Sequence, residues 1–285
     1  MPRRSAPGRG GPAGNPWRSP VAVLGFLAVV VTVILVGGAL ASPEDSPAPA
    51  LSSVPQATGT VDRSSLERNP IYRARPLTAT CRAPEADDTE TRLALLNTMA
   101  DCMDAAWHPA FTARALSFQL PTRIFWTEPG RGPCGDYPGD AAAYYCWANH
   151  GIYLGAADDE HRMVLTAILA HEYGHHVQEI SGLSDAAVDR MYHATSKDAV
   201  NAVSRRVELQ ADCFAGVWFG AARRSLPVTP DDWRLILDDF ARRGDDDDDR
   251  THGTGEHGAA WLNGGYLGRT PGHCVTWAAP AADVD

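Results

Sequence analysis

Two histidines four residues apart, with a glutamate next to the first, are the strongest candidates for chemistry in this sequence. They are His171, Glu172 and His175, within the apolar stretch 168–177. On a helix, residues four apart lie on the same face, so both imidazoles can bind one metal ion. The glutamate can then take a proton from a metal-bound water. The alternative is a buried helix whose histidines only form hydrogen bonds with their neighbours.

Residues 206–216 form a second helix-like stretch, which contains two carboxylates suited to completing a metal site. Glu208 and Asp212 are four residues apart and share a helix face. Catalytic zinc takes three protein ligands and leaves a fourth position open. One carboxylate can therefore bind the metal while the other accepts the outer N–H of a zinc-bound histidine. A solvated carboxylate pair is the alternative, but it does not explain the Val, Leu, Ala, Cys and Phe residues around it.

Taken together, residues 171–178 and 207–216 resemble the bacterial "putative neutral zinc metallopeptidase" family. Shorter matches elsewhere extend the resemblance over residues 81–274. No His-x-x-Gly-x-x-His extension follows the first motif, which agrees with a gluzincin and not a metzincin pattern. The resemblance implies a gluzincin-like fold, a zinc ion held by His171, His175 and Glu208, and a catalytic Glu172. It implies no particular substrate.

A gluzincin also needs a donor that stabilises the oxyanion of the reaction, usually from beyond the metal-binding helices. His252 is our candidate for this catalytic role, and Tyr145 and Tyr153 are alternatives. His252 could instead act at the start of the helix that follows it. The family tends to have Ser-x-Gln-Arg after residues 252–254, whereas this chain has Gly-Glu-His-Gly at 255–258. No role is therefore carried over to the residues around His257.

These residues predict hydrolysis of a peptide bond in a peptide or protein substrate. Zinc would lower the pKa of its water, Glu172 would take a proton from that water and pass it to the leaving amine, and Asp212 would orient a zinc-bound histidine. Two other functions stay open. One is a non-catalytic binding module with a zincin fold, and the other is a zinc hydrolase of a non-peptide amide, such as a cell-wall cross-link.

The first 76 residues predict a membrane anchor followed by a linker. Residues 1–20 are rich in Pro, Gly and Arg without an acid, as in a disordered cytoplasmic arm. Residues 21–41 are an uncharged apolar run long enough to span a bilayer as one transmembrane helix. A cleaved signal peptide is the alternative, because residues 39–42 resemble a cleavage site. In both cases the Pro/Ala/Ser-rich linker 42–76 and the peptidase domain 77–280 are extracytoplasmic.

The cysteines and the net charge restrict the compartment and the partners. All 6 cysteines follow the apolar run, which suits disulfides in an oxidising compartment. Zinc binding by cysteine is disfavoured because no Cys-x-x-Cys occurs, and a net charge of −10 argues against a nucleic-acid partner. Many connectivities are possible, and the pairs we expect are Cys81–Cys102, Cys134–Cys146 and Cys213–Cys274.

Hydrophobic periodicity predicts an α+β domain that is mainly helical and has a small β-sheet, and the family resemblance implies that this domain is zincin-like. Helices are expected at 91–107, 158–180, 199–224, from 230 onward, and up to 261. A strand is expected at 123–126 and a hairpin at 143–155, with its turn at 149–151. The hairpin is our candidate for binding substrate backbone by strand addition. The acidic run 245–249 is interpreted as a solvated loop with no assigned role.

Overall fold

The computed structural model describes residues 65–137, 143–156, 160–245 and 250–285. The predicted arm, the predicted membrane helix and most of the predicted linker lie outside these ranges. Among the described helices, none has both the length and the apolar character needed to cross a bilayer. The folded region reaches past both expected boundaries: Leu66 and Ile71 are fully buried, and Val284 is buried as well.

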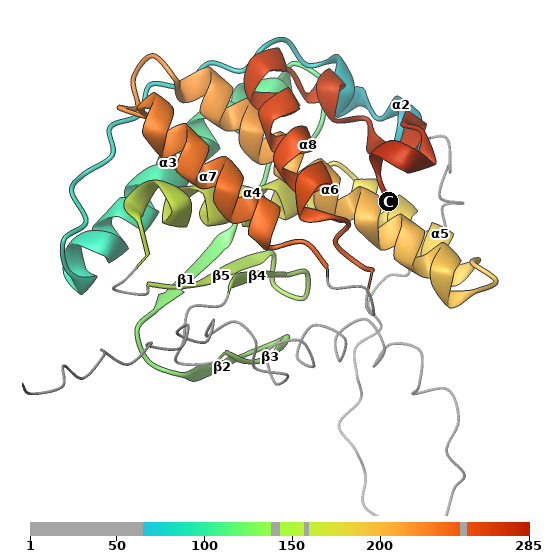
Figure 1. The fold of residues 1–285 in the computed structure, drawn as a ribbon, viewed down its shortest axis with the longest axis horizontal. Coiled ribbons are helices and arrows are strands. Elements are labelled where there is room, and N and C mark those ends of the chain that lie inside the picture. Colours follow the sequence, from blue (N-terminus) through green and yellow to red (C-terminus); the bar gives the residue numbers. More distant parts are fainter. Residues whose placement is uncertain (1–64, 138–142, 157–159, 246–249) are drawn as a thin grey trace, which may run out of the picture. The chain divides into compact units, whose positions relative to one another are not determined.

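Helices make up most of the fold, and α4 lies at its centre (Figure 1). It contacts β4 and β5 on one side, and α3, α6 and α7 on its other sides. The prediction of a mainly helical α+β domain is therefore confirmed. The helices are α2 (Ser65–Arg68), α3 (Thr89–Thr112), α4 (Arg162–Ile180), α5 (Leu183–Tyr192), α6 (Lys197–Ala222), α7 (Pro230–Arg242) and α8 (Gly255–Gly268), with short 3₁₀ turns η2 (Pro70–Arg73), η3 (Pro271–Cys274), η4 (Thr276–Ala278) and η5 (Ala281–Asp283).

Local capping signals explain where the helices begin and end. Gly182 has φ 79° just after α4, a left-handed conformation that glycine adopts easily, and α4 ends at Ile180, the residue expected from the sequence. A reciprocal capping box between Thr229 and Asp232 starts α7, with Pro230 in its first turn. The start of α4 differs from the expected residue 158. His161 is its N-cap and accepts a hydrogen bond from the Met163 amide, so the helix begins at Arg162.

The sheet next to α4 contains the predicted strand and the predicted hairpin. Its order is β1-β5-β4, formed by β1 (Thr122–Trp126), β5 (Gly151–Gly155) and β4 (Ala143–Cys146). The β4 and β5 strands pair antiparallel with Cys146 opposite Gly151, which confirms the hairpin. Strand β1 adds to β5 in parallel. A separate antiparallel pair, β2 (Gly130–Gly132) and β3 (Gly135–Tyr137), forms outside the predicted strand and hairpin.

Glycines allow the metal-motif helices to approach each other closely. A Cβ atom on Gly174 of α4 would lie 2.7 Å from the backbone oxygen of Ala211 on α6. Helix α8 also packs tightly against α6, because a Cβ on Gly216 would lie 1.9 Å from the carbonyl oxygen of Leu262. Gly174 lies between Glu172 and His175, so the close α4–α6 contact occurs where the two predicted metal-binding stretches meet.

We expect Gly174→Ala to destabilise the fold by about 1–3 kcal/mol, because the new methyl group would force α4 away from rigid backbone in α6. Gly264→Ala on α8 is the matched control, because nothing lies within 4 Å of a Cβ at that position. Alanine there should stabilise the helix by up to about 1 kcal/mol. Urea unfolding of both variants measures the difference, and equal free energies of unfolding would contradict the packing argument.

Three disulfides join segments of this fold, and they are the three expected pairs. Cys81–Cys102 and Cys134–Cys146 close short loops, with sequence separations of 21 and 12 residues. Cys213–Cys274 ties η3 to α6 across 61 residues. None of the six cysteines is free. The bridge at Cys213 directly follows Asp212, so it also holds the predicted metal-binding part of α6 in place.

Candidate metal centre

The side chains of His171, His175 and Glu208 converge between α4 and α6. One ligand atom from each lies within 4.8 Å of the others. The two histidine Nε2 atoms are 3.1 Å apart, and Glu208 Oε2 is 3.4 Å from His171 Nε2 and 3.3 Å from His175 Nε2. Ligand atoms at zinc-bond distance from one tetrahedral ion lie roughly 3.3–3.5 Å apart. The spacing therefore fits three corners of a single tetrahedron.

The outer nitrogen of each histidine is already used in a hydrogen bond. His171 Nδ1 donates to Asp212 Oδ1 at 2.6 Å, and His175 Nδ1 donates to Gln178 Oε1 at 2.9 Å. With both Nδ1 atoms protonated, the Nε2 atoms of the neutral rings present lone pairs to each other and to the Glu208 carboxylate. Three electron-rich atoms facing one another repel unless a cation lies between them. Two imidazoles and a carboxylate are also a donor set of catalytic zinc.

The site is buried but still reachable from solvent. The side chains of His171 and His175 are 19% and 12% exposed, and that of Glu208 is 9% exposed. Burial raises the pKa of Glu208, but a positive charge facing the carboxylate lowers it: when the histidine rings are protonated, the charge of His175 and hydrogen bonds from both rings outweigh burial and hold the pKa well below its ordinary value. Glu208 is thus kept ionised, as a ligand must be.

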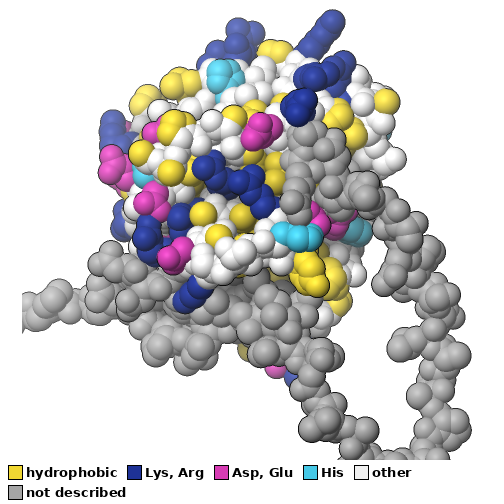
Figure 2. Space-filling model, turned by 90° about the vertical axis from the view of Figure 1, so that its right-hand side faces the viewer, with side chains coloured by type: hydrophobic (Ala, Val, Ile, Leu, Met, Phe, Trp, Pro, Cys, Tyr) yellow, Lys and Arg dark blue, Asp and Glu magenta, His cyan; other side chains and the backbone are white. Residues whose placement is uncertain are grey.

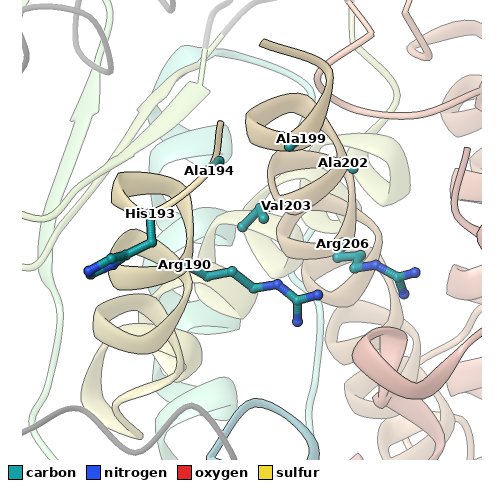
Figure 3. Close-up of a pocket in the computed structure, with 7 residues that line it drawn as sticks. All are labelled: Arg190, His193, Ala194, Ala199, Ala202, Val203 and Arg206. Carbon is teal, nitrogen blue, oxygen red and sulfur yellow. The ribbon is translucent and has the colours of Figure 1, made fainter. Parts of the chain in front are cut away.

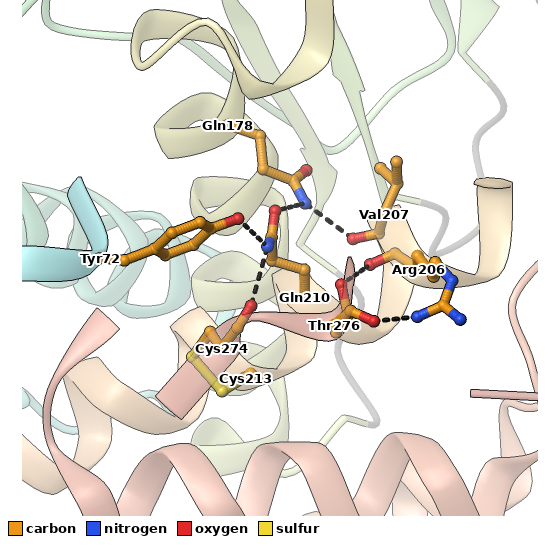
Figure 4. Close-up of a disulfide and its surroundings, with 8 residues drawn as sticks. All are labelled: Tyr72, Gln178, Arg206, Val207, Gln210, Cys213, Cys274 and Thr276. Atoms are coloured by element: carbon orange, nitrogen blue, oxygen red, sulfur yellow. Dashed lines mark hydrogen bonds between the residues drawn. A yellow bond between two sulfur atoms is a disulfide. The ribbon is translucent and has the colours of Figure 1, made fainter. Parts of the chain in front are cut away.

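Gln178, the hydrogen-bond partner of His175, is held in place by a chain of buried side-chain hydrogen bonds (Figure 4). Gln178 donates to the backbone oxygen of Val207 at 2.8 Å and to Gln210 Oε1 at 3.1 Å, which leaves its own oxygen for His175. Gln210 donates in turn to Tyr72 Oη and to the backbone oxygen of Cys274, both at 2.8 Å. The Cys213–Cys274 disulfide fixes this last acceptor. We did not predict Gln178 or Gln210; polar residues within apolar helical runs were the available signal.

Glu172 is buried next to the two histidines, as its place in the motif implies. It is 6% exposed. Burial raises the pKa of Glu172, whereas His171 and His175 lower the pKa when their rings are protonated. A carboxylate with a raised pKa beside a metal site can accept a proton and return it near neutral pH.

The loop that carries His252 lies on the Glu208 side of the centre. The neighbouring Gly253 packs on Leu209, because a Cβ at Gly253 would lie 3.4 Å from that side chain. Burial lowers the pKa of His252, but its hydrogen bond with Asp245 and the charge of Glu208 outweigh burial and raise the pKa to about 9. His252 and Glu208 therefore influence each other electrostatically.

Asp245 corrects our reading of the acidic run as a loop without a role. Its Oδ1 is 3.0 Å from His252 Nδ1, and its Oδ2 accepts hydrogen bonds from the backbone amides of His252 and Gly253. Asp245 is the first residue of the acidic run, and it lies against His252, seven residues later in the sequence. The other four acids, residues 246–249, lie outside the described residues. Charge composition alone could not separate Asp245 from its neighbours.

The two tyrosine alternatives lie in different surroundings from His252. Tyr145 Oη is 3.1 Å from His176 Nδ1 and 3.4 Å from His150 Nδ1, on the β4 side of α4. His176 is fully buried, and burial lowers its pKa to about 4, so it is held as a neutral structural residue. Tyr153 belongs to a separate apolar cluster with Trp126 and Cys146. Tyr153 is thus part of the core on the sheet side.

A hollow of about 480 Å³ also lies between α5 and α6, but its polar groups do not converge. Figure 3 shows Arg190 extending across it while His193 turns away, and His193 bonds to the Asp189 backbone oxygen. The Arg206 guanidinium is used by the backbone oxygens of Thr276 and Ala279. Figure 2, viewed from the α5 side, shows Lys and Arg side chains mixed with hydrophobic ones on this face. None of the residues that line this hollow is one of the three converging ligands.

Sequence comparisons connect this chain to bacterial relatives. Uncharacterized protein YpfJ of Escherichia coli (strain K12) is 29% identical over 191 residues, which are 60% of this chain and 66% of that protein, just under two thirds of its length. Uncharacterized protein Mb2605 of Mycobacterium bovis and uncharacterized protein Rv2575 of Mycobacterium tuberculosis are each 27% identical over 210 residues, 62% of this chain and 68% of theirs. No solved structure matches significantly.

The family profile of the "putative neutral zinc metallopeptidase" proteins matches residues 60–277. This range contains both helices of the candidate metal centre, the loop with His252 and all three disulfides. It also covers well over half of the 285 residues. The chain therefore belongs to the putative neutral zinc metallopeptidase family.

Proposed function

We propose that this protein is a zinc-dependent endopeptidase whose metal is held by His171, His175 and Glu208. One observation carries the proposal: three lone-pair-bearing ligand atoms face one another at 3.1–3.4 Å while both histidine Nδ1 atoms are already bonded. The arrangement suits a divalent cation with borderline-soft character. The family assignment and the motif spacing support the same metal.

The residues around this centre divide the work of hydrolysis. Zinc, when bound, supplies a Lewis acid that activates water and polarises a carbonyl group. Glu172 takes a proton from the attacking water and delivers it to the leaving amine nitrogen. Asp212 keeps the proton of His171 on Nδ1 and so fixes the ring that binds through Nε2. Gln178 does the same for His175 through its Oε1 atom.

His252 stabilises the oxyanion in this proposal. Its imidazole is held by Asp245 through Nδ1, and in this proposal its Nε2 donates toward the reacting carbonyl. Its electrostatic coupling to Glu208 supports a position beside the metal centre. An ordered donor of this kind contributes most when it is fixed before the reaction begins.

The substrate is a peptide or protein segment in an extended conformation. Strand β4 is an edge of the three-stranded sheet and has no second strand partner among the described residues. The same strand contacts α4, which carries the metal motif. An extended peptide can therefore pair with β4 and lie along the metal-binding helix, with backbone hydrogen bonds supplying affinity.

We further propose that the peptidase domain acts outside the cytoplasm, anchored by residues 21–41. The three disulfides support an oxidising compartment. The uncharged apolar run and the arginines before it support an anchor whose N-terminus is inside. No nucleic-acid partner is proposed for a chain of net charge −10.

An unbiased peptide-library digest by the full-length, detergent-purified protein tests this function. We expect cleavage with zinc, loss of cleavage after chelation, and recovery when one equivalent of zinc is returned. Metal binding without cleavage of any library peptide would instead favour a binding module. Cleavage of cell-wall cross-links but not of the library would favour a hydrolase of non-peptide amides. A digest that continues unchanged in chelator would refute the zinc mechanism.

A further inference from the structure

The buried guanidinium of Arg205 connects α6 to two segments that are distant in sequence. Arg205 is 9% exposed and lies three residues before Glu208. Its Nη1 donates to the backbone oxygen of Arg250 at 2.7 Å, and its Nε donates to the backbone oxygen of Val284 at 3.2 Å. Its Nη2 lies 3.0 Å from Asp285 Oδ1. Arg205 thus joins the metal-binding helix to the start of the His252 loop and to residues 283–285.

Residues 283–285, which we call the C-terminal strap, contact the His252 loop and the beginning of α8. The Asp285 carboxylate also contacts the Arg250 guanidinium. The backbone oxygen of Asp285 accepts hydrogen bonds from His257 Nδ1 at 2.7 Å and from the Thr254 amide at 3.5 Å. Trp261 donates to the Asp283 backbone oxygen at 2.8 Å. The strap therefore binds residues on both sides of His252 and the beginning of α8.

The backbone of this loop needs such support. Arg250 has φ 46°, a left-handed conformation that costs a non-glycine residue about 1 kcal/mol or more. Its carbonyl and its guanidinium are both held, by Arg205 and by Asp285 respectively. Asp245 binds the loop at Thr251, His252 and Gly253. The strap is consequently the second anchor of the loop, at the residues before and after those that Asp245 holds.

We propose that Arg205 and Asp285 are positioning residues that fix His252 beside the metal centre. The proposal rests on the proposed function, because it assigns the strap a role in the same reaction. It also gives His257 a part that the family resemblance did not supply: the His257 imidazole binds the strap. In this chain, residues 283–285 are therefore a component of the active site, although they contact neither metal nor substrate.

The test combines amide hydrogen exchange with kinetics on the full-length zinc-loaded protein. Asp285→Ala should increase exchange at residues 250–254 by about fivefold or more, because the contacts of the Asp285 carboxylate with Arg205 and Arg250 are lost. Of the strap's contacts with these two arginines, only that of the Val284 backbone oxygen with Arg205 would remain. The substitution should lower kcat by about tenfold with KM and zinc content unchanged. Asp285→Asn keeps an oxygen acceptor for both arginines and should recover most of kcat. Asp231→Ala, which removes the exposed ion pair with Arg234 on α7, is the control.

A double mutant separates positioning from general stability. In a His252→Ala background, Asp285→Ala should cause no further loss of kcat, since the residue it positions is gone. A loss of the same size in both backgrounds would overturn the proposal. Unchanged exchange at 250–254 in Asp285→Ala would overturn it independently of any activity. Absence of peptidase activity in the wild-type protein would refute the proposed function, and the exchange result would still show whether the strap holds the loop.

Discussion

Glu172→Gln is expected to abolish peptide hydrolysis while leaving the bound zinc in place. Glutamine has nearly the same shape as glutamate but cannot take a proton from water, so the general-base contribution of about 10²–10⁴-fold in kcat is lost. Glu172 is 6% exposed and lies between the two histidines of α4, so no other carboxylate on that helix can replace it easily. Turnover of a peptide identified in the library digest measures the loss.

Zinc content and stability must be measured on the same variant. Glu172 is not one of the three converging ligands, so zinc should remain at one equivalent per chain. Removing a buried carboxylate whose pKa is raised by burial should not destabilise the fold. Glu90→Gln, the same chemical change at an exposed position in the first turn of α3, is the control and should keep full activity. A Glu172→Gln protein with wild-type kcat would remove Glu172 from the mechanism.

Much of the candidate site could be predicted because its first part is local. The i, i+4 spacing of His171 and His175 fixes their common face as soon as the segment is helical, whatever the rest of the chain does. The convergence of Glu208 is different, because it depends on how α4 packs on α6. The resemblance supplied that pairing, and Gly174 gives its physical reason, since only a residue without Cβ allows the helices to come so close.

The partners of the site could not be predicted from local patterns. Gln178 and Gln210 act through a hydrogen-bond chain that ends on Tyr72 and Cys274, far away in sequence. Asp245 is one of five identical neighbours, and only its contact with His252 distinguishes it. Such roles depend on tertiary contacts between segments that have no periodicity of their own.

The fold, like the site, could be predicted where local patterns determine it and not where it depends on contacts between distant segments. Helix bounds followed capping residues and hydrophobic period, so α6 and α7 lie close to where they were expected. The N-terminal boundary of the folded region could not be predicted in this way, because the buried residues Leu66 and Ile71 are isolated apolar residues in a segment whose composition resembles a linker. Leu66 lies in α2, which contacts α5, and Ile71 lies in η2, which contacts η3; no local pattern reveals these contacts.

Glu208→Ala should remove the metal site while leaving the two histidines in place. Two imidazoles alone supply an incomplete donor set. Loss of a residue that only orients a ligand lowers metal affinity by up to about 100-fold, so loss of a ligand itself should lower the zinc affinity by well over about 100-fold. Competition with a chromophoric chelator measures this affinity. Peptidase activity at equimolar zinc should disappear together with the metal.

Asp212→Asn is the matched comparison, because it changes a carboxylate one helical turn away that hydrogen-bonds to His171 at 2.6 Å without being one of the three converging ligands. Its zinc affinity should fall only about 10–100-fold. Zinc should raise the melting temperature of the wild-type protein, because a ligand that binds only the folded state stabilises it, and this rise should be absent in Glu208→Ala. Equal zinc affinity in Glu208→Ala and the wild type would mean that the carboxylate facing both Nε2 atoms at 3.3–3.4 Å does not bind the metal. The third ligand would then have to come from another residue.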